Sequence, residues 1–216
     1  VKMKKIILMA LLGFSFVNSA TINDGMAYYN KGDYAKAFEI YYILAKDNND
    51  TKAQYNTALM FLKGQGINKS NKDALYWYTK AANQNHAPSQ YALGYMYQKD
   101  AKTNPTLIKQ AQYWYGRAMK NNFREAYTNM AFLYYNGYAK IIPKDIHKAI
   151  ILFTKAAQMG DSNAQLNLGI IYGWSDEILK NKLKSYSYLK QALENGNGQA
   201  GNYLDVLCKE SSWICR

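Results

Sequence analysis

The chain has 216 residues, of which 49% are apolar, 19% charged and 15% aromatic, with only 3 prolines. This composition suits one helical domain, or at most two small ones, and excludes a collagen-like or disordered chain. Two cysteines and two histidines argue against a disulfide-framework mini-protein, a four-cysteine zinc site and any site built from several imidazoles. We therefore expect no metal site and no cofactor. The formal net charge is +12.

Residues 1–20 have the pattern of a secretory signal peptide. Three lysines precede the apolar run from Ile6 to Leu12, and the small residues Ser19 and Ala20 end the segment. The alternative is a membrane anchor, but the run is shorter than the ~20 residues that span a bilayer. We expect cleavage after Ser19 or Ala20, a periplasmic or secreted mature protein, and no integral membrane segment in it.

The rest of the chain repeats itself. The small residues that mark each unit recur at spacings of 36, 37, 38 and 36 residues; they are Ala53, Ser89, Ala126, Ala164 and Ala200. Counted from the first four anchors as position one, the fifth residue is Thr, Leu or Met, the sixth is Ala or Gly, and the ninth is aromatic. Residues four apart lie above one another on a helix, so positions one, five and nine predict one buried stripe. We call this helix, which opens each unit, helix A.

A second amphipathic helix, helix B, precedes each following anchor. It opens with a small residue, and bulky or small apolar residues follow three, four, seven and eight places later; the openings are Ala74, Ala111, Ala149 and Ser185. Eleven places after each opening stands a residue that tolerates the left-handed conformation ending a helix; these are Asn85, Asn122, Gly160 and Gly196. One helix pair cannot bury its apolar face alone, so the sequence predicts an all-α fold, an α-solenoid of stacked helix-turn-helix repeats.

The fragments AQYNTALMFLKGQG, KDALYWYTKAANQNHAPSQYALGYMY and KAIILFTKAAQMGDSNAQLNLGIIY resemble Sel1-like repeats, the longer relatives of tetratricopeptide repeats. The resemblance implies a tetratricopeptide-like repeat over 21–52, four Sel1-like repeats over 53–199 and a capping helix over 200–216. It also implies an adaptor that binds a protein or peptide partner in the concave groove of the solenoid. The exported Helicobacter cysteine-rich proteins are partly similar, but they carry a disulfide in each repeat.

Helix A has a second stripe, at positions three, seven and ten. By analogy with tetratricopeptide stacking, we expect this stripe to line the concave groove, where aromatic residues are typical binding anchors. Its members are Tyr55, Leu59, Leu62, Tyr91, Tyr95, Gln98, Thr128, Phe132, Tyr135, Leu166, Ile170 and Gly173. The alternative is that part of the stripe is core, because helix A touches several neighbours in a solenoid.

The two cysteines, Cys208 and Cys215, are an even number in a chain expected to be exported, which predicts a disulfide between them. In one continuous helix their α-carbons would be about 10 Å apart, too far for a bridge. We therefore expect the helix to break near residues 209–212. Two free buried thiols are the alternative.

The alternative function is a weak β-lactamase or penicillin-binding hydrolase, because some cysteine-rich relatives are described in this way. The sequence from Ser187 to Lys190 matches S-x-x-K, but the companion motifs S-D-N and K-T-G are absent, so a scaffold is favoured over an enzyme. The lysines are scattered over every repeat, which indicates attraction to acidic envelope surfaces and argues against a nucleic-acid site.

Overall fold

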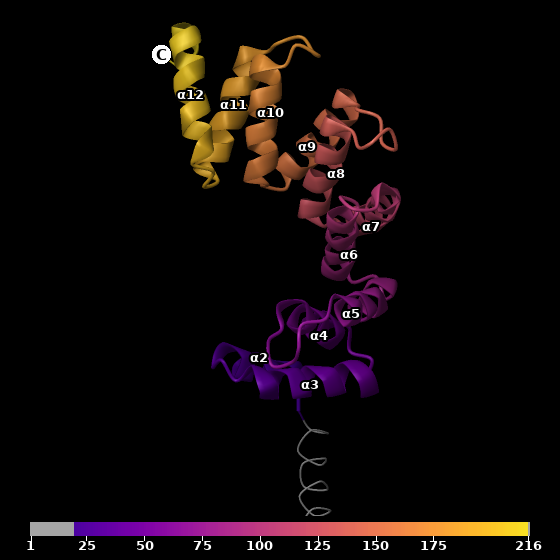
Figure 1. The fold of residues 1–216 in the computed structure, drawn as a ribbon. Helices are drawn as coiled ribbons and strands as arrows, with labels where there is room; N and C mark the ends of the chain where they lie inside the picture. Colours follow the sequence, from indigo (N-terminus) through magenta and orange to yellow (C-terminus); the bar gives the residue numbers. More distant parts are fainter. Residues whose placement is uncertain (1–19, 216) are drawn as a thin grey trace, which may run out of the picture. The chain divides into compact units, whose positions relative to one another are not determined.

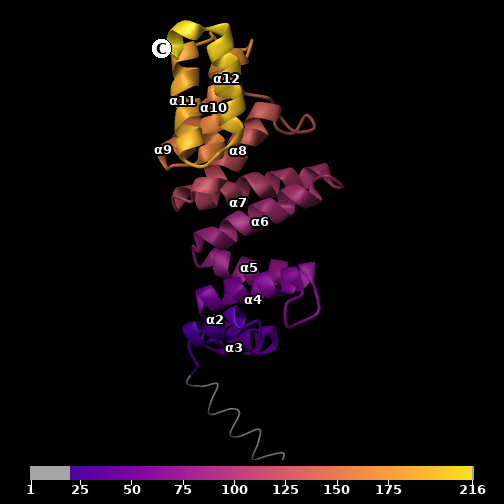
Figure 2. The same ribbon diagram turned by 90° about the vertical axis from the view of Figure 1, so that its left-hand side faces the viewer.

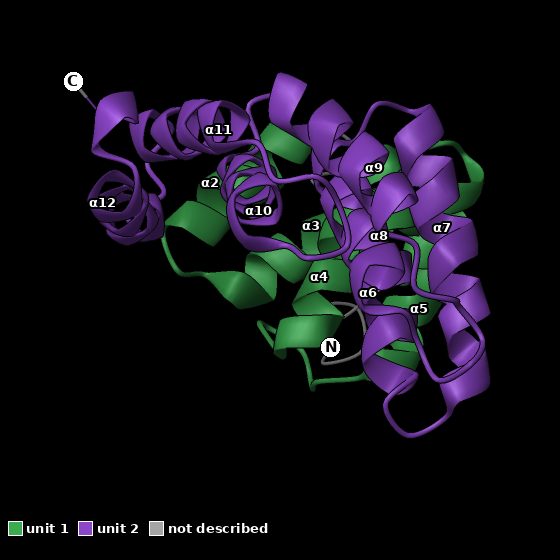
Figure 3. Ribbon diagram, turned by 90° about the horizontal axis from the view of Figure 1, so that it is seen from above, with its two compact units in different colours: residues 1–93 green, residues 94–216 purple. Residues whose placement is uncertain are grey.

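The computed structural model describes residues 20–215. They form eleven α-helices and two short 3₁₀ helices, with one isolated β-bridge between Tyr138 and Ile142. The packing divides the chain into two compact units, residues 1–93 and 94–216, coloured separately in Figure 3. Within the described range the predicted all-α class is confirmed.

Unit 1 contains four helices and the first half of a fifth. They are α2 (Ile22–Asn30), α3 (Tyr34–Asp47), α4 (Thr51–Lys63), α5 (Asn71–Asn83) and the start of α6 (Ala87–Asp100). Helix α2 packs on α3, α3 on α4, and α4 on α5, so neighbours in sequence are neighbours in space (Figure 1).

Unit 2 continues the same arrangement. Its elements are the second half of α6, η1 (Pro105–Leu107), α7 (Ile108–Lys120), α8 (Arg124–Asn136), α9 (Ile146–Gln158), α10 (Ser162–Trp174), α11 (Lys182–Glu194), α12 (Gln199–Glu210) and η2 (Ser212–Ile214). Helices α10, α11 and α12 stand side by side in both views (Figures 1 and 2). Even-numbered helices are the predicted A helices, and α3, α5, α7, α9 and α11 are the B helices.

Side chains at the helix starts and turns explain where the helices begin and end. Most helices open on an Asp, Ser or Asn whose side chain accepts a hydrogen bond from the backbone N–H three residues on; these caps include Asp50, Ser70, Asp145, Asp161 and Asn181. The predicted left-handed residues follow the B helices, with φ angles of 63° (Asn85), 54° (Asn122), 82° (Gly160) and 87° (Gly196).

The core of each repeat lies between its helix A and its helix B. Positions one and five of the A helices α4, α6, α8 and α10 are buried, as predicted; they are Ala53, Thr57, Ser89, Leu93, Ala126, Met130, Ala164 and Leu168. Position nine, predicted to be buried with them, is only half-buried, because its large ring reaches the edge of the core; its residues are Phe61, Tyr97, Tyr134 and Tyr172. A Cβ added at Gly94 would lie 2.5 Å from the Tyr115 ring, and one at Gly169 would lie 2.6 Å from Leu189. The sixth residue is therefore tiny because a helix B side chain occupies the space beside it.

Position two of helix A ties each hairpin to the one before it. The amides of Gln54, Gln90 and Gln165 donate to backbone carbonyls in the last turn of the preceding B helix, at 3.4, 3.0 and 3.2 Å. In α8 the same position is Tyr127, whose hydroxyl donates to the Met119 carbonyl at 2.9 Å. The carbonyls lie at helix ends; those of Ala82, Met119 and Ala157 also accept a backbone N–H from the turn that follows the helix, so the side-chain bond is a second one that links the two hairpins.

The C-terminal helix breaks where the cysteines require it. Helix α12 ends at Glu210, and Ser211 takes an extended φ of −151° before the short η2 turn. This break brings the α-carbons of Cys208 and Cys215 to 5.7 Å, and the two residues form a disulfide. The predicted bridge is confirmed, and the alternative of two free thiols is wrong.

The predicted signal peptide lies almost wholly outside the described residues, which begin at position 20. Between positions 20 and 215, none of the helices has the length and apolar character needed to cross a bilayer.

Candidate functional site

Position three of helix A is not on an open groove in unit 2. Thr128 and Leu166 are each only 6% exposed. The Thr128 hydroxyl donates to the Asp161 carboxylate, the cap of the next A helix, at 2.9 Å, and Leu166 packs in a cluster with Leu189 and Leu207. This is a correction to the sequence prediction: position three faces the following repeat, so its side chains are covered. Gly173 is buried as well.

Positions seven and ten in unit 2 lie at the edge of the core. Phe132 packs edge-on against Phe153, with ring centroids 5.1 Å apart. Tyr135 lies with its ring 5.8 Å from the Lys144 ammonium. Ile170 packs against the cluster around Leu166. Phe132, Tyr135 and Ile170 are half-buried, so each keeps one side accessible.

On α4 and α6, the predicted residues differ in their surroundings. Tyr55 contacts the rings of Tyr78 and His86, which makes it part of the packing. Gln98 accepts a hydrogen bond from the Tyr115 hydroxyl at 2.6 Å. Leu59, Leu62 and Tyr91 are half-buried. Tyr95 is the most open of the predicted set, with 56% of its surface exposed.

The residues that share the accessible side of the A helices are at positions four and seven. Gly25 packs against Tyr41 as Gly94 packs against Tyr115, which places α2 in the same register as the other A helices. In four A helices position four is then asparagine and position seven is apolar: Asn23 and Met26, Asn56 and Leu59, Asn129 and Phe132, Asn167 and Ile170. None of these eight side chains is buried. Four of them lie in unit 1, and we call these four residues the asparagine face: Asn23, Met26, Asn56 and Leu59.

In unit 1 the asparagine face contains a small cavity. Its volume is about 160 Å³, and it is lined by Met26, Tyr29, Tyr41, Asn56, Leu59 and Met60. Burial, with a further contribution from Tyr29, raises the pKa of Tyr41, so its phenol stays neutral at physiological pH. The Tyr29 hydroxyl donates to Gln65 at 2.9 Å. The lining is therefore uncharged and largely apolar, which suits an aliphatic side chain.

The Asn56 amide lies at this cavity and makes no hydrogen bond within residues 20–215. The corresponding amide of Asn129 donates to the Tyr115 hydroxyl at 3.1 Å, and that of Asn167 donates to the Asn163 carbonyl at 2.7 Å. Asn56 thus combines an available donor and acceptor with an adjacent apolar cavity. Among the residues described, this is the combination best suited to holding a peptide.

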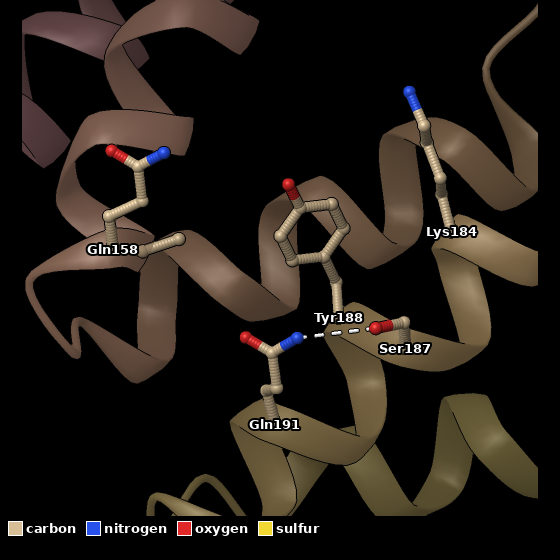
Figure 4. Close-up of a pocket in the computed structure, with 6 residues that line it drawn as sticks. Gln158, Lys184, Ser187, Tyr188 and Gln191 are labelled. Atoms are coloured by element: carbon tan, nitrogen blue, oxygen red, sulfur yellow. Dashed lines mark hydrogen bonds between the residues drawn. The ribbon is translucent and has the colours of Figure 1, made fainter.

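The S-x-x-K motif lies on α11. The Ser187 hydroxyl accepts a hydrogen bond from the Gln191 amide at 3.2 Å, drawn as the dashed line in Figure 4. Ser187 borders a cleft with Gln191 and Lys184, but Lys190 does not line it. The arrangement therefore pairs Ser187 with an amide, which is not a base that activates a nucleophile.

A family model described as Sel1 repeat matches four consecutive segments, residues 51–86, 87–123, 124–161 and 162–197. The chain belongs to the Sel1 repeat family. Sel1 repeats generally mediate protein–protein interactions and are generally non-enzymatic scaffolds. The solenoid class predicted from the repeats is confirmed by the solved Sel1-type structures that the chain resembles.

Two of these solved structures cover most of this Sel1 chain. A Sel1 repeat protein from Oxalobacter formigenes is 28% identical with a TM-score of 0.74, over 85% of this chain and 74% of that one. A protective antigen of uropathogenic Escherichia coli is 26% identical with a TM-score of 0.73, over 88% of this chain and 40% of that one. A putative sel1-like repeat-containing protein of Acanthamoeba polyphaga mimivirus is 30% identical over 125 residues, 58% of this chain but 22% of its own length.

Sequence reasoning missed the asparagine at position four. The signal was present, because Asn56, Asn129 and Asn167 stand at the same offset from their anchors. The aromatic side chains at positions three and seven instead favour a groove stripe that starts at position three, one residue earlier. One residue corresponds to a rotation of about 100° around the helix, which in unit 2 separates the covered Thr128 and Leu166 from the more accessible Asn129 and Asn167.

Proposed function

We propose that the chain is an exported scaffold that binds an extended peptide segment of another protein along the asparagine face. The observation that carries the proposal is the pairing of the Asn56 amide with the apolar cavity beside Leu59. Sel1 repeats generally mediate protein–protein interactions, which supports this proposal.

The chemistry of the two positions is complementary. An asparagine side chain offers one acceptor oxygen and two donor hydrogens, which match the C=O and N–H of a peptide backbone of any sequence. The apolar residue three places on lies on the same side of the helix and offers a contact for a side chain. Asparagine thus orients the peptide backbone, while the cavity near Met26 and Leu59 selects an aliphatic residue.

Of the predicted groove residues in unit 2, Tyr95 and Tyr135 keep an accessible side, and we keep them as proposed partner contacts of that unit, separate from the asparagine face. Thr128 and Leu166 are no longer proposed, because they are buried. Export to the periplasm or medium is part of the proposal: the disulfide between Cys208 and Cys215 is a bond that persists in oxidising compartments, and residues 1–20 have the pattern of a signal peptide.

The test is a display selection of random peptides on the purified chain, followed by fluorescence anisotropy with the selected peptides. We expect Leu59→Ala to weaken binding by about tenfold, as loss of a buried anchor does. Asn56→Ala should weaken it by roughly three- to tenfold, the value of one hydrogen bond. Selected peptides should share an aliphatic residue.

The matched control is Tyr76→Ala. Tyr76 is 52% exposed on the B helix α5 of the same unit and does not line the cavity, so its removal should leave affinity unchanged. The proposal is refuted if the selected peptides bind Asn56→Ala and Leu59→Ala as tightly as they bind the parent. It is also refuted if only Tyr76→Ala weakens binding, because the binding surface would then lie on other helices.

A further inference from the structure

We propose that a cleft between α9 and α11 is a second binding site, separate from the asparagine face, for a single sugar ring that carries a carboxylate group. The cleft has a volume of about 280 Å³ and lies wholly within unit 2. Its lining residues are Ala157, Gln158, Lys184, Ser187, Tyr188 and Gln191. This volume is just below the range of roughly 300–1,000 Å³ that drug-sized ligands occupy, which suits one ring.

The lining offers polar groups at several points around the cleft. Figure 4 shows the Tyr188 side chain standing between Gln158 on one side and Lys184 on the other, with Ser187 and Gln191 hydrogen-bonded below it. Tyr188 itself is held by parallel stacking on Tyr172, with ring centroids 6.0 Å apart. The central aromatic side chain is thus fixed in place by packing within the same hairpin.

The cleft exists because this repeat departs from its neighbours. Two places after the B-helix opening, the other B helices of the four repeats have Tyr76, Tyr113 and Ile151, but α11 has Ser187. Six places after the opening they have Lys80, Arg117 and Lys155, but α11 has Gln191. On the opposite wall, α9 has Ala157, the same small residue as Ala82 of α5, where α7 has Met119. The smaller Ser187 and Gln191 are therefore the lining residues that distinguish this hairpin from the others.

The charge of the cleft is positive. No carboxylate lines it, and its only charged lining group is the Lys184 ammonium. Within residues 20–215, Lys184 belongs to no ion pair, and its ammonium lies 4.9 Å from the centroid of the Tyr172 ring. The neighbouring Lys180 and Lys182, in contrast, each pair with a carboxylate. Lys184 is therefore available to a negatively charged ligand.

The remaining groups favour a ligand rich in hydroxyls. The amides of Gln158 and Gln191 and the hydroxyls of Ser187 and Tyr188 each donate and accept hydrogen bonds, as sugar hydroxyls do. An ammonium pairs with a carboxylate in a charge-assisted hydrogen bond, which is stronger than a neutral one. A hexuronate ring combines both features, and it is the class of ligand that the cleft fits.

The experiment titrates the full chain with glucuronate, glucose and acetate, monitored by chemical shifts of backbone amides. We expect glucuronate to shift residues of α9 and α11 with a Kd on the order of 1 mM, as for a small polar ligand, and the other two to bind at least about tenfold more weakly. Lys184→Met should weaken glucuronate by about tenfold, whereas Lys155→Met, the same charge change outside the cleft, should have no effect.

Ser187→Tyr tests the cleft itself. It restores the residue found at this position in α5 and α7, so the helix should fold, which circular dichroism would check, and the tyrosine should fill the space and abolish binding. Glucose binding as tightly as glucuronate, acetate binding equally well, or glucuronate binding unchanged in Ser187→Tyr would each overturn the proposal. So would the absence of any shift on α9 and α11 with glucuronate.

Discussion

Single glycines decide how closely helix B approaches helix A. A Cβ at Gly94 would lie 2.5 Å from the ring of Tyr115. That ring is fully buried, and its hydroxyl donates to Gln98 at 2.6 Å, so it has no free direction in which to move. We predict that Gly94→Ala lowers the free energy of unfolding by about 1–3 kcal/mol, the usual cost of overpacking.

The control is Gly116→Ala in α7. No heavy atom lies within 4 Å of a Cβ built at Gly116, and the residue is inside a helix. Alanine there should raise the free energy of unfolding by about 0.5–1 kcal/mol, because glycine loses more backbone entropy on folding. Urea unfolding of both variants measures the two effects. Changes of the same sign would show that the contact with Tyr115 is not what constrains position six.

At the scale of one element, α12 depends on links beyond its own helix. The disulfide joins its last turn to the residue after η2. The Lys182 ammonium at the start of α11 donates to the Ser211 hydroxyl at 2.6 Å, which fixes the break in the chain from the other side. We predict that Cys208→Ser combined with Cys215→Ser lowers the free energy of unfolding by about 2 kcal/mol, the chain-entropy value for so short a loop.

Hydrogen exchange on the same double variant locates the effect. Amides of residues 204–214 should exchange faster than in the parent, whereas those of α4, in the core of unit 1, should keep their protection, since a solenoid transmits stability mainly to adjacent repeats. Equal loss of protection throughout both units would mean that the bridge stabilises the chain globally, against this prediction.

For the whole molecule, the question is whether charge or shape dominates binding. The chain has a formal net charge of +12, which attracts acidic polymers over a distance that salt shortens. The asparagine face has no charged residue at positions four and seven. We predict that affinity for a selected peptide changes less than about twofold between 50 and 300 mM salt, whereas adsorption to polyglutamate falls by more than about tenfold.

Anisotropy with an uncharged peptide and sedimentation with polyglutamate provide the two measurements. A parallel fall of both affinities would indicate that the peptide is held by the net charge of the chain, and the asparagine face would then lose its role. The disulfide variant, which has the same charge, should show the same salt dependence as the parent in both assays.

The repeat pattern predicted the helices and the core well, because both depend on local periodicity. Residues that recur four apart share a side of any helix, so Ala53 and Thr57 had to lie together whatever packed against them. The turns at Asn85 and Gly160 were predictable for a similarly local reason, because few residue types tolerate a positive φ. The cysteine spacing likewise required the break in α12.

The sequence by itself therefore determined the Sel1 register, the burial of positions one and five, and the bridge between Cys208 and Cys215. Only the tertiary structure decided which of two adjacent helix sides stays accessible, because that depends on where the next repeat lies. Thr128 and Leu166 are covered by residues more than twenty positions away, Asp161 and Leu189, and periodicity within one helix has no information about such distant partners. The cleft beside Ser187 arises in the same way, from side chains on two helices that meet only in the folded chain.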